Sequence, residues 1–562
     1  MSRCTEATVE QPSQQLRGPS HPRGELLQWL NPNLDDITAD GAGDLLDAVA
    51  ASLQGHGPTN LFDDPPPLIF DPVEASAYRP DPVELPGSST REAREPDLDG
   101  IPWLPGHVLA DLTARGVLTR SEVIKAFSYQ IDTWDSSLNA FIRVTLDPQA
   151  DLGDSRGLLA GIPIGLQDMV CTSGIPTTAG SGILRDFVPD RDAAAWKRLK
   201  GEGAILAGKL NTQEFAAGTT GTNDHYGSMR NPWDLARTAG GAAGGAGAAV
   251  AAGLVSSAIG TDPGGSIRVP AAHCGIVGLK PTFGVMDRRG VVPLTWTTET
   301  MGVLAQTIGG TASIADMLLD SRARQRYGIS CQEASARGSA RDRIDLRIGV
   351  PSNWLEMGLD EGVQRAYLQA LSELVSLGAT VHEVVLPDAA AIAPVHRAIA
   401  FSEASSIHEE LIMDRATEYG QDIRQRQEAG RGVMASEYLK AARLRGLFAR
   451  QFSEVWKDVD VIVTPTTPVP AAPVGTLSIG TGSRGKEPAH TVYTRYAAPL
   501  NTLGLPALSV PCGFTKEGLP VGLQLCGPPH SEPMLFYVGA AYESKMPWHL
   551  RHPNHPVTLG GK

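Results

Sequence analysis

The chain has 562 residues, and 42 % of them are hydrophobic, which is enough to bury a sizeable core. Its formal net charge of −14 argues against nucleic acid as a primary partner. No stretch of 18 apolar residues is free of glycine, and residues 1–15 lack the apolar core of a secretory signal, so the sequence predicts neither a membrane partner nor secretion.

The cysteines indicate a reducing, cytoplasmic environment. Six are scattered through the chain with no C-x-x-C spacing, at positions 4, 171, 274, 331, 512 and 526. This pattern is typical of free buried thiols rather than of a disulfide framework. Because the chain has no H-E-x-x-H motif and no metal-like His/Cys cluster, we expect neither a metal nor an organic cofactor.

Residues 1–102 are predicted to be an acidic, proline-rich extension. Residues 1–100 contain 18 Asp and Glu against six Arg and no Lys, so nearly all of the net charge lies there. The prolines between positions 58 and 105 disfavour regular structure. This segment is either an arm that wraps the core or is partly disordered, or else a docking segment for a partner or a neighbouring subunit.

The remaining chain divides into a main domain over residues 103–550 and a tail over 551–562. From residue 108 the apolar spacing predicts helices, and Thr119 with Glu122 three residues later fits a capping box. Strand and helix then alternate up to about residue 310, which predicts an α/β sheet flanked by helices. The expected elements are strands at 161–170 and 204–210 and a helix at 190–199.

The stretch from residue 239 to 282 differs from everything around it. Its first part, 239–252, consists almost entirely of Ala and Gly and is interpreted as a buried helix whose glycines allow close approach of another backbone. A short strand is expected at 256–260, followed by the sequence GTDPGGSIR, which contains Ser266. A serine on a glycine-rich turn after a strand is a recurring arrangement for a nucleophile, because backbone N–H groups converge there on a developing oxyanion.

The last third of the chain shows generic patterns. Residues 311–345 are polar and in places helix-breaking, whereas 360–450 carry long charged helical patterns within a helical region of about 311–450. Further strands are expected at 346–350 and 459–464.

The blocks 240–250 and 260–282 resemble the core motif of the amidase signature family of serine hydrolases, without a gap. The resemblance covers roughly residues 103–548 and implies an α/β fold, with a mixed central β-sheet flanked by α-helices and a site at the strand ends around Ser266. In that family a Ser–cis-Ser–Lys triad cuts amides. The resemblance also implies a hairpin-like closing segment over residues 500–524. Homodimers are common among members of the family, so the resemblance includes a homodimer among the expected partners.

When the family motif is aligned with this chain residue by residue, the residues around the site match the motif, but residues within the site differ from it. The resemblance implies that Ser266 is the nucleophile, whereas the cis-serine position holds Ala242 and the lysine position holds Gln167. Glutamine cannot take up a proton at neutral pH, and alanine has no hydroxyl to relay one. The resemblance therefore predicts the catalytic positions Ser266, Gln167 and Ala242. The last two cannot accept or relay the proton of the serine hydroxyl.

The oxyanion loop and its supports follow from the same resemblance. Backbone N–H groups of Gly264, Gly265 and Ser266 are expected to bind the substrate oxyanion, while Pro263 has no N–H to offer. Three charged residues match family positions and are interpreted as supports of the loop, namely Asp168, Asp262 and Arg268. His273, seven residues after Ser266, is either a core residue or a replacement base.

Three functions remain open from the sequence. The chain could bind a small-molecule amide or acyl substrate and catalyse a step that does not need the lysine, such as a cyclisation, an isomerisation or an acyl transfer. It could instead be a non-catalytic pseudoamidase that acts as a binding or partner protein. It could also be a weak amidohydrolase that cuts C–N amide bonds through Ser266.

Overall fold

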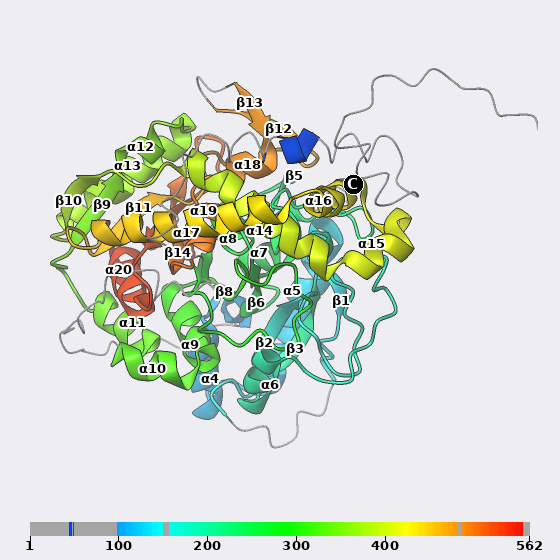
Figure 1. The fold of residues 1–562 in the computed structure, drawn as a ribbon. Coiled ribbons are helices and arrows are strands. Elements are labelled where there is room, and N and C mark those ends of the chain that lie inside the picture. Colours follow the sequence, from blue (N-terminus) through cyan, green and yellow to red (C-terminus); the bar gives the residue numbers. More distant parts are fainter. Residues whose placement is uncertain (1–43, 48, 50–97, 150–156, 482–484, 555–562) are drawn as a thin grey trace, which may run out of the picture.

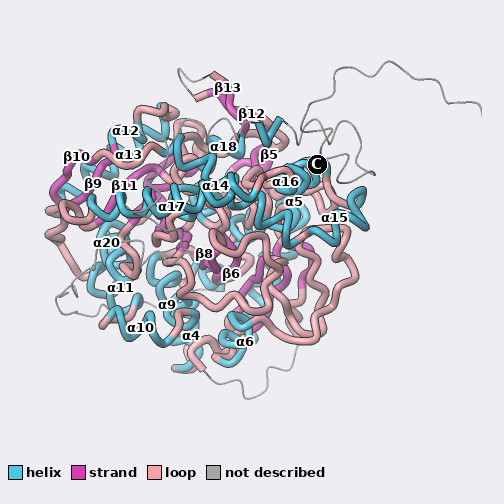
Figure 2. Tube along the Cα trace, in the orientation of Figure 1, coloured by secondary structure: helices cyan, strands magenta, loops and turns pink. Residues whose placement is uncertain are grey.

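The computed structural model describes residues 44–47, 49, 98–149, 157–481 and 485–554. Their centre is a mixed sheet in the order β1-β3-β2-β6-β8-β7-β14-β15-β11-β9-β10 (Figures 1 and 2). The strands of this sheet are β1 (Phe141–Val144), β2 (Pro163–Gln167), β3 (Ile205–Leu210), β6 (Ser257–Asp262), β7 (Val277–Lys280), β8 (Thr300–Ala305), β9 (Arg347–Pro351), β10 (Thr380–Val384), β11 (Val461–Pro465), β14 (Ala507–Phe514) and β15 (Pro520–Cys526). Two small ribbons pair β4 (Arg230–Asn231) with β5 (Asp234–Thr238) and β12 (Ser478–Gly480) with β13 (Lys486–Pro488).

The first half of the chain confirms the predicted alternation of strands and helices. The helices there are η1 (Leu98–Trp103), α4 (Gly106–Ala114), α5 (Arg120–Leu138), α6 (Ala194–Gly201), η2 (Glu214–Ala216), α7 (Gly244–Ala251) and α8 (Arg268–Cys274). The capping box of α5 is present, since the Thr119 hydroxyl accepts from Glu122 N–H and the Glu122 carboxylate accepts from Thr119 N–H. β2 is parallel to both β3 and β6, which are central strands fully covered by helices.

The Ala/Gly stretch forms a shorter helix than predicted. α7 begins at Gly244, and residues 241–243 before it form a bend. The peptide bond between Gly241 and Ala242 is cis. A Cβ atom on Gly245 would lie 2.5 Å from the carbonyl oxygens of Ala140 and Asn211. Glycine is therefore required there for the helix to pack directly on neighbouring backbone.

The later part of the chain departs from the predicted helical pattern at one strand. Residues 311–345 are helical with short interruptions, and polar residues at the interruptions cap the next helix, since the side chains of Asp320 and Ser330 accept from backbone N–H groups at the starts of α10 (Ser321–Tyr327) and α11 (Cys331–Ser339). Within the region expected to be helical, residues 380–384 form β10, a strand at the sheet edge that pairs in parallel with β9. Because most of its side chains are exposed, its sequence lacks the apolar signal of a buried strand.

The helices of this second half cover both faces of the sheet. They are α9 (Ile308–Leu318), α10 (Ser321–Tyr327), α11 (Cys331–Ser339), α12 (Ser352–Leu355), α13 (Glu361–Ser376), α14 (Ala389–Ile407), α15 (Glu409–Arg415), η3 (Ala416–Glu418), α16 (Gln421–Arg431), α17 (Ala435–Val455), α18 (Ala489–Thr494), α19 (Ala498–Thr502), α20 (Glu532–Lys545) and η5 (Trp548–Leu550). In Figure 1, α14 and α17 cross the front of the molecule, and α14 contacts α16, α17 and α19. The predicted hairpin is confirmed, since β14 and β15 pair antiparallel from Ala507 and Cys526 to Phe514 and Pro520.

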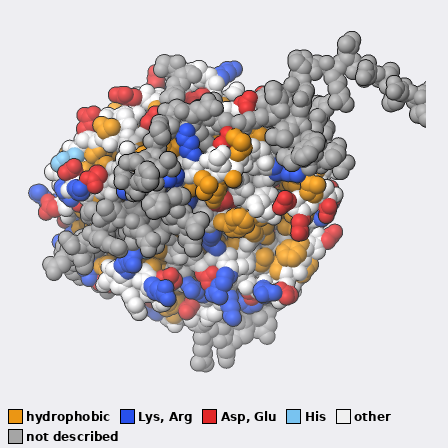
Figure 3. All heavy atoms as spheres, in the orientation of Figure 1, with side chains coloured by type: hydrophobic (Ala, Val, Ile, Leu, Met, Phe, Trp, Pro, Cys, Tyr) orange, Lys and Arg blue, Asp and Glu red, His pale blue; other side chains and the backbone are white. Residues whose placement is uncertain are grey.

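Only a small piece of the acidic extension lies within the described residues. Leu46 is buried and packs against Ala429 of α16, with Phe401 of α14 beside it, and Val49 is buried in the neighbouring apolar cluster. The rest of 1–97, and residues 555–562 of the predicted tail, lie outside the described part of the chain. The front face of the described domain carries basic and acidic side chains interspersed, in agreement with its near-neutral charge (Figure 3).

No described helix is both long and apolar enough to cross a membrane.

Candidate functional site

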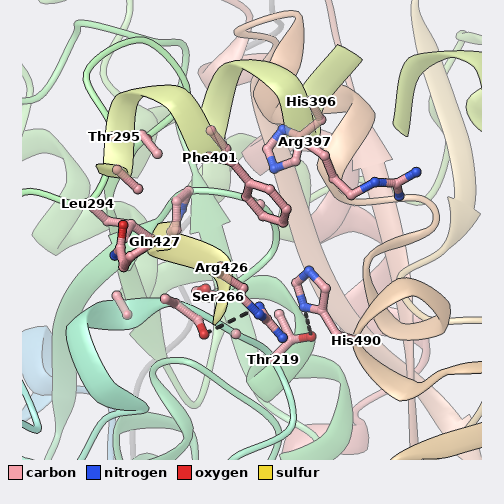
Figure 4. Close-up of a pocket in the computed structure, with 17 residues that line it drawn as sticks. Thr219, Ser266, Leu294, Thr295, His396, Arg397, Phe401, Arg426, Gln427 and His490 are labelled. Atoms are coloured by element: carbon pink, nitrogen blue, oxygen red, sulfur yellow. Dashed lines mark hydrogen bonds between the residues drawn. The ribbon is translucent and has the colours of Figure 1, made fainter. Parts of the chain in front are cut away.

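Ser266 lies in the turn between β6 and α8 and faces an internal cavity of about 70 Å³ (Figure 4). The side chain is only 1 % exposed. The roof of the cavity comes from α14 and α16, and its floor comes from the loops around Thr219 and Gly264. The lining residues are Ala216, Ala217, Gly218, Thr219, Pro263, Gly264, Ser266, Leu294, Thr295, His396, Arg397, Ala400, Phe401, Ala404, Arg426, Gln427 and His490.

The roof is tied to the sheet by a buried carboxylate. Glu403 on α14 accepts hydrogen bonds from the backbone N–H groups of Trp296 and Thr297 at 2.8 and 2.9 Å and from the Thr297 hydroxyl at 2.6 Å. These bonds attach the helix to the loop that leads into β8. The part of α14 that lines the cavity is therefore held in place by this loop.

The backbone around Ser266 retains part of the expected oxyanion site. Among the described residues, the N–H groups of Gly264 and Ser266 donate no hydrogen bond, and both residues line the cavity. The Gly265 N–H instead donates to the Asp262 carboxylate at 2.5 Å, which narrows the predicted set of oxyanion donors to Gly264 and Ser266. Pro263 also lines the cavity but has no N–H.

Asp262 and Arg268 hold this turn in place, as the sequence predicted for supports. Both side chains are fully buried, and the guanidinium contacts both carboxylate oxygens, at 3.0 Å from Nε and 3.1 Å from Nη2. Burial alone would raise the Asp262 pKa, but the charge and hydrogen bonds of Arg268 outweigh it and lower the pKa to about 2. Asp262 also accepts from Ile267 N–H at 3.2 Å, so one carboxylate braces the whole loop.

Gln167, at the end of β2, is buried and bridges two neighbouring segments. Its Oε1 accepts from Thr261 N–H at 2.7 Å, and its Nε2 donates to the Thr212 hydroxyl at 2.8 Å. Thr212 in turn donates to the Ala242 carbonyl at 3.1 Å. The amide of Gln167 thus satisfies a backbone donor of β6 and is connected through Thr212 to the turn that contains Ala242.

Ala242 itself is fully buried in an apolar cluster with Phe215 and Met169. Neither Gln167 nor Ala242 lines the cavity, although both lie in segments directly adjoining the Ser266 turn, since Ala243 N–H donates to the Ser266 carbonyl at 3.2 Å. Among the described residues, no group forms a hydrogen bond with Ser266 Oγ. The structure therefore brings the three predicted positions together in space without a proton acceptor at the hydroxyl.

Asp168 forms a buried ion pair that the sequence analysis missed. Lys209, on β3, lies 3.2 Å from the Asp168 carboxylate, and its Nζ donates to the Val170 carbonyl at 2.5 Å and to the Thr177 hydroxyl at 2.7 Å. Burial lowers the Lys209 pKa, against the attraction of Asp168. Since Lys209 does not line the cavity, it fastens the segment after β2 and is not placed to act on Ser266. The sequence signal that could have revealed this ion pair was a lysine within an otherwise apolar strand pattern.

Comparison with known proteins agrees with the motif. The amidase family model matches residues 122–536. A glutamyl-tRNA(Gln) amidotransferase subunit from Chloroflexus aggregans is 37 % identical over 479 residues, covering 78 % of this chain and 96 % of that protein. The chain belongs to the amidase family.

Solved structures of similar proteins share the fold of this amidase-family chain. A crystal structure described as an amidase superposes with a TM-score of 0.71 at 28 % identity, covering 79 % of this chain and 100 % of that one. An inhibitor-bound vestigial protein complex, connected with the origins of an s-triazine catabolic enzyme, gives a TM-score of 0.73 at 30 % identity, covering 79 % and 99 %. The α/β fold with a large mixed sheet is therefore the family fold.

His273 is a core residue in this amidase-family protein. It is buried in α8, its ring packs edge-on against Tyr493 at a centroid distance of 4.6 Å, and it is absent from the cavity lining. Burial lowers its pKa to about 3. Of the two interpretations left open by the sequence, the structure favours the core residue.

The cavity contains other polar groups that the sequence analysis did not single out. His396 and Arg397 come from α14, Arg426 and Gln427 from α16, and His490 from α18 (Figure 4). They lie in a region whose sequence pattern is generic, and only the tertiary fold brings them to Ser266. Within the described part of the chain, no group of three His, Cys, Asp or Glu side chains could hold a metal ion.

The two cavity histidines are neutral and fixed at one nitrogen. His396 Nδ1 lies 3.0 Å from the Thr502 hydroxyl, and that hydroxyl donates to the Ala498 carbonyl at 2.9 Å. Since Thr502 has one proton, His396 Nδ1 is the donor of this pair, which leaves Nε2 as an acceptor. His490 Nδ1 lies 3.0 Å from the Thr219 hydroxyl. Burial lowers the pKa of both rings, to about 4 for His396.

Proposed function

We propose that this amidase-family protein binds an amide or acyl substrate over Ser266 and catalyses a step other than ordinary hydrolysis. The step is a cyclisation, an isomerisation or an acyl transfer. The substrate carbonyl lies toward the N–H groups of Gly264 and Ser266, and the Ser266 hydroxyl positions it. The observation that carries the proposal is the bridging role of Gln167, whose amide oxygen and nitrogen each form a hydrogen bond at the position where the family resemblance places a lysine.

Hydrolysis through a serine needs a base beside the hydroxyl, and the absence of one among the predicted catalytic positions supports a different reaction. A serine hydroxyl is a weak nucleophile and needs an adjacent base. Loss of general-base assistance costs about 10²–10⁴ in rate for a typical step. Ala242 removes the relay hydroxyl as well, but residues that act as a unit are not additive, so the second loss adds little to the first.

The site nevertheless has the features of a substrate-binding pocket. The loop around Ser266 is braced by the buried Asp262–Arg268 pair, and the cavity combines apolar walls with converging polar groups. Relatives named as an amidase and as part of an amidotransferase support amide or acyl chemistry in such a pocket. Because the amidotransferase relative is named as one subunit of its enzyme, it also supports assembly with further chains as part of the proposal.

Two other functions compete with this proposal. A pseudoamidase would bind a partner or ligand with no turnover, and the altered positions Gln167 and Ala242 favour it. A weak amidohydrolase would act through Ser266, and the retained serine with the N–H groups of Gly264 and Ser266 favours it. The three functions differ in whether Ser266 becomes acylated and whether water enters the product.

The test combines a serine-directed fluorophosphonate probe with product analysis by mass spectrometry. We expect no probe mass on Ser266 in the wild-type protein. In the variant Gln167→Lys/Ala242→Ser/Pro263→Thr we expect labelling at Ser266 and cleavage of members of an amide panel, with Ser266→Ala as the unlabelled control. Wild-type products that have gained no water support the proposal.

Other results decide between the alternatives. Labelling of wild-type Ser266, with hydrolysis that disappears in Ser266→Ala, would establish the weak amidohydrolase and overturn the proposal. Saturable binding of panel members without any product would establish the pseudoamidase. Circular dichroism of each variant confirms that the fold is retained before the comparison is made.

A further inference from the structure

A second cavity adjoins the one at Ser266. It has a volume of about 190 Å³, against about 70 Å³ for the first, and lies between the start of α14 and helices α18 and α19. Three residues line both cavities, namely His396, Arg397 and His490. The two spaces are therefore neighbours that share part of their lining.

Arg397 differs from the other cations of the two cavities. Arg426 is paired with Asp422 at 2.9 Å, and Arg495 is ion-paired with Glu487. For Arg397, by contrast, the described residues supply no ion pair and no hydrogen bond. Its side chain is half-buried and runs to the side of the cavity where His490 lies, opposite Gln427 (Figure 4).

The surroundings of Arg397 favour a negative charge. Among the described lining residues of the first cavity there is no Asp or Glu. The second cavity contributes Glu487, but this carboxylate is already bound by Arg495 and by the Thr481 hydroxyl at 3.0 Å. Burial lowers the pKa of Arg397, and no acidic neighbour opposes this shift. The side chain still stays charged at neutral pH, because the ordinary pKa of an arginine lies far above 7.

A half-buried cation without a counter-ion is unfavourable until an anion reaches it. The guanidinium presents a planar fork of N–H donors whose geometry matches a carboxylate edge. The hydroxyl of Thr491, which also lines the second cavity, offers a further donor within the same space. The first cavity supplies a hydrogen-bond acceptor instead, since Gln427 Oε1 is buried there without a partner among the described residues.

We propose that the second cavity binds a carboxylate of the substrate through Arg397, while the amide or acyl carbonyl of the same molecule lies over Ser266. This inference rests on the proposed function and narrows it to substrates that carry a carboxylate at some distance from the reacting carbonyl. Gln427 contacts the amide end, and Arg397 binds the acid end.

The experiment is calorimetric titration of the full-length protein with N-acetylglycine, N-acetyl-β-alanine and N-acetyl-4-aminobutyrate, each beside its methyl ester. The three acids place the carboxylate progressively farther from the amide, and the esters remove only the charge. We expect at least one acid to bind more tightly than its ester. Arg397→Gln should weaken that acid about 10- to 100-fold, as expected for loss of a hydrogen bond to a charged group, and leave the ester unchanged.

Two further variants keep the result interpretable if Arg397→Gln folds poorly. Arg397→Lys retains the charge but not the fork and should bind with intermediate affinity. Arg322→Gln, at an exposed position on α10, is the matched control and should behave as wild type. A salt titration should weaken binding of the acid only.

The outcomes separate this inference from the proposed function. Equal binding of acids and esters, unaffected by Arg397→Gln, overturns the carboxylate site and leaves the amide site standing. Binding of glutarate that depends on Arg397, without any contribution from the amide group, keeps the carboxylate site and removes the support for the proposed function. Binding of inorganic phosphate that depends on Arg397, together with no binding of the carboxylates, overturns the assignment to a carboxylate.

Discussion

Gln167 offers the sharpest test of how the site is built, and the perturbation is Gln167→Met. Methionine matches the length of glutamine and fills irregular space, so it removes the hydrogen bonds with little change in volume. The pairing of β2 with β6 ends at Leu166 and Ile259, and the Gln167 Oε1 then takes the next free donor, Thr261 N–H, at 2.7 Å. The substitution leaves this buried N–H without a partner.

The magnitude follows from the two bonds lost. A buried donor left unsatisfied costs about 1–3 kcal/mol, and the bond from Nε2 to Thr212 contributes about 0.5–1.5 kcal/mol. We therefore expect the free energy of unfolding to fall by about 2–4 kcal/mol. Thr212 keeps its own bond to the Ala242 carbonyl, so the turn before α7 should stay in place.

The assay is urea unfolding followed by tryptophan fluorescence, with the slope compared between variants to confirm that the same transition is measured. The control is Gln332→Met, at an exposed position on α11, where a surface substitution should change stability by no more than about 0.5 kcal/mol. If Gln167→Met is no less stable than this control, the amide does not support the β6 strand end, and the structural reason for glutamine at this position fails.

Further predictions concern the buried charges and thiols. Asp262→Asn leaves the Arg268 guanidinium buried without its partner, so we expect a loss of about 3–5 kcal/mol in urea unfolding, whereas little change would place the loop's stability elsewhere. Because the folded pKa of Asp262 is lowered to about 2, its contribution is complete above the unfolded pKa and is lost as the pH falls toward 2. The stability difference between wild type and Asp262→Asn should therefore shrink from pH 5 downward, and a constant difference would contradict the ion pair. Burial raises the pKa of both Cys274 and Cys171, but Cys274 is fully buried and Cys171 only half-buried, so a thiol reagent at pH 8 should label Cys171 before Cys274 in the native protein, as peptide mass spectrometry can show. Early labelling of Cys274 would mean that α8 opens locally.

Local patterns in the sequence were sufficient for much of the fold. The capping box at Thr119 is formed by residues three apart, and the hairpin at residues 507–526 is contiguous, so both could be predicted without knowing the tertiary structure. The edge strand at residues 380–384 could not, because its exposed side chains carry no apolar pattern and its pairing with β9 exists only within the assembled sheet. The helices of residues 308–339 lie largely within the region predicted to be helical, but their ends could not be placed from polarity, because the same polar residue types cap helices in some contexts and interrupt them in others.

The sequence by itself indicated the family and the candidate site positions Ser266, Gln167 and Ala242, because these lie in contiguous motifs whose residues can be compared one by one with the family motif. Only the tertiary structure decided what surrounds Ser266. Arg397, Gln427 and His490 come from three helices separated by up to 93 positions in the printed numbering, and no local pattern connects them. Packing of α14, α16 and α18 around the Ser266 turn gives these polar side chains a common cavity, because convergence in space depends on the fold and not on neighbouring residues in the chain.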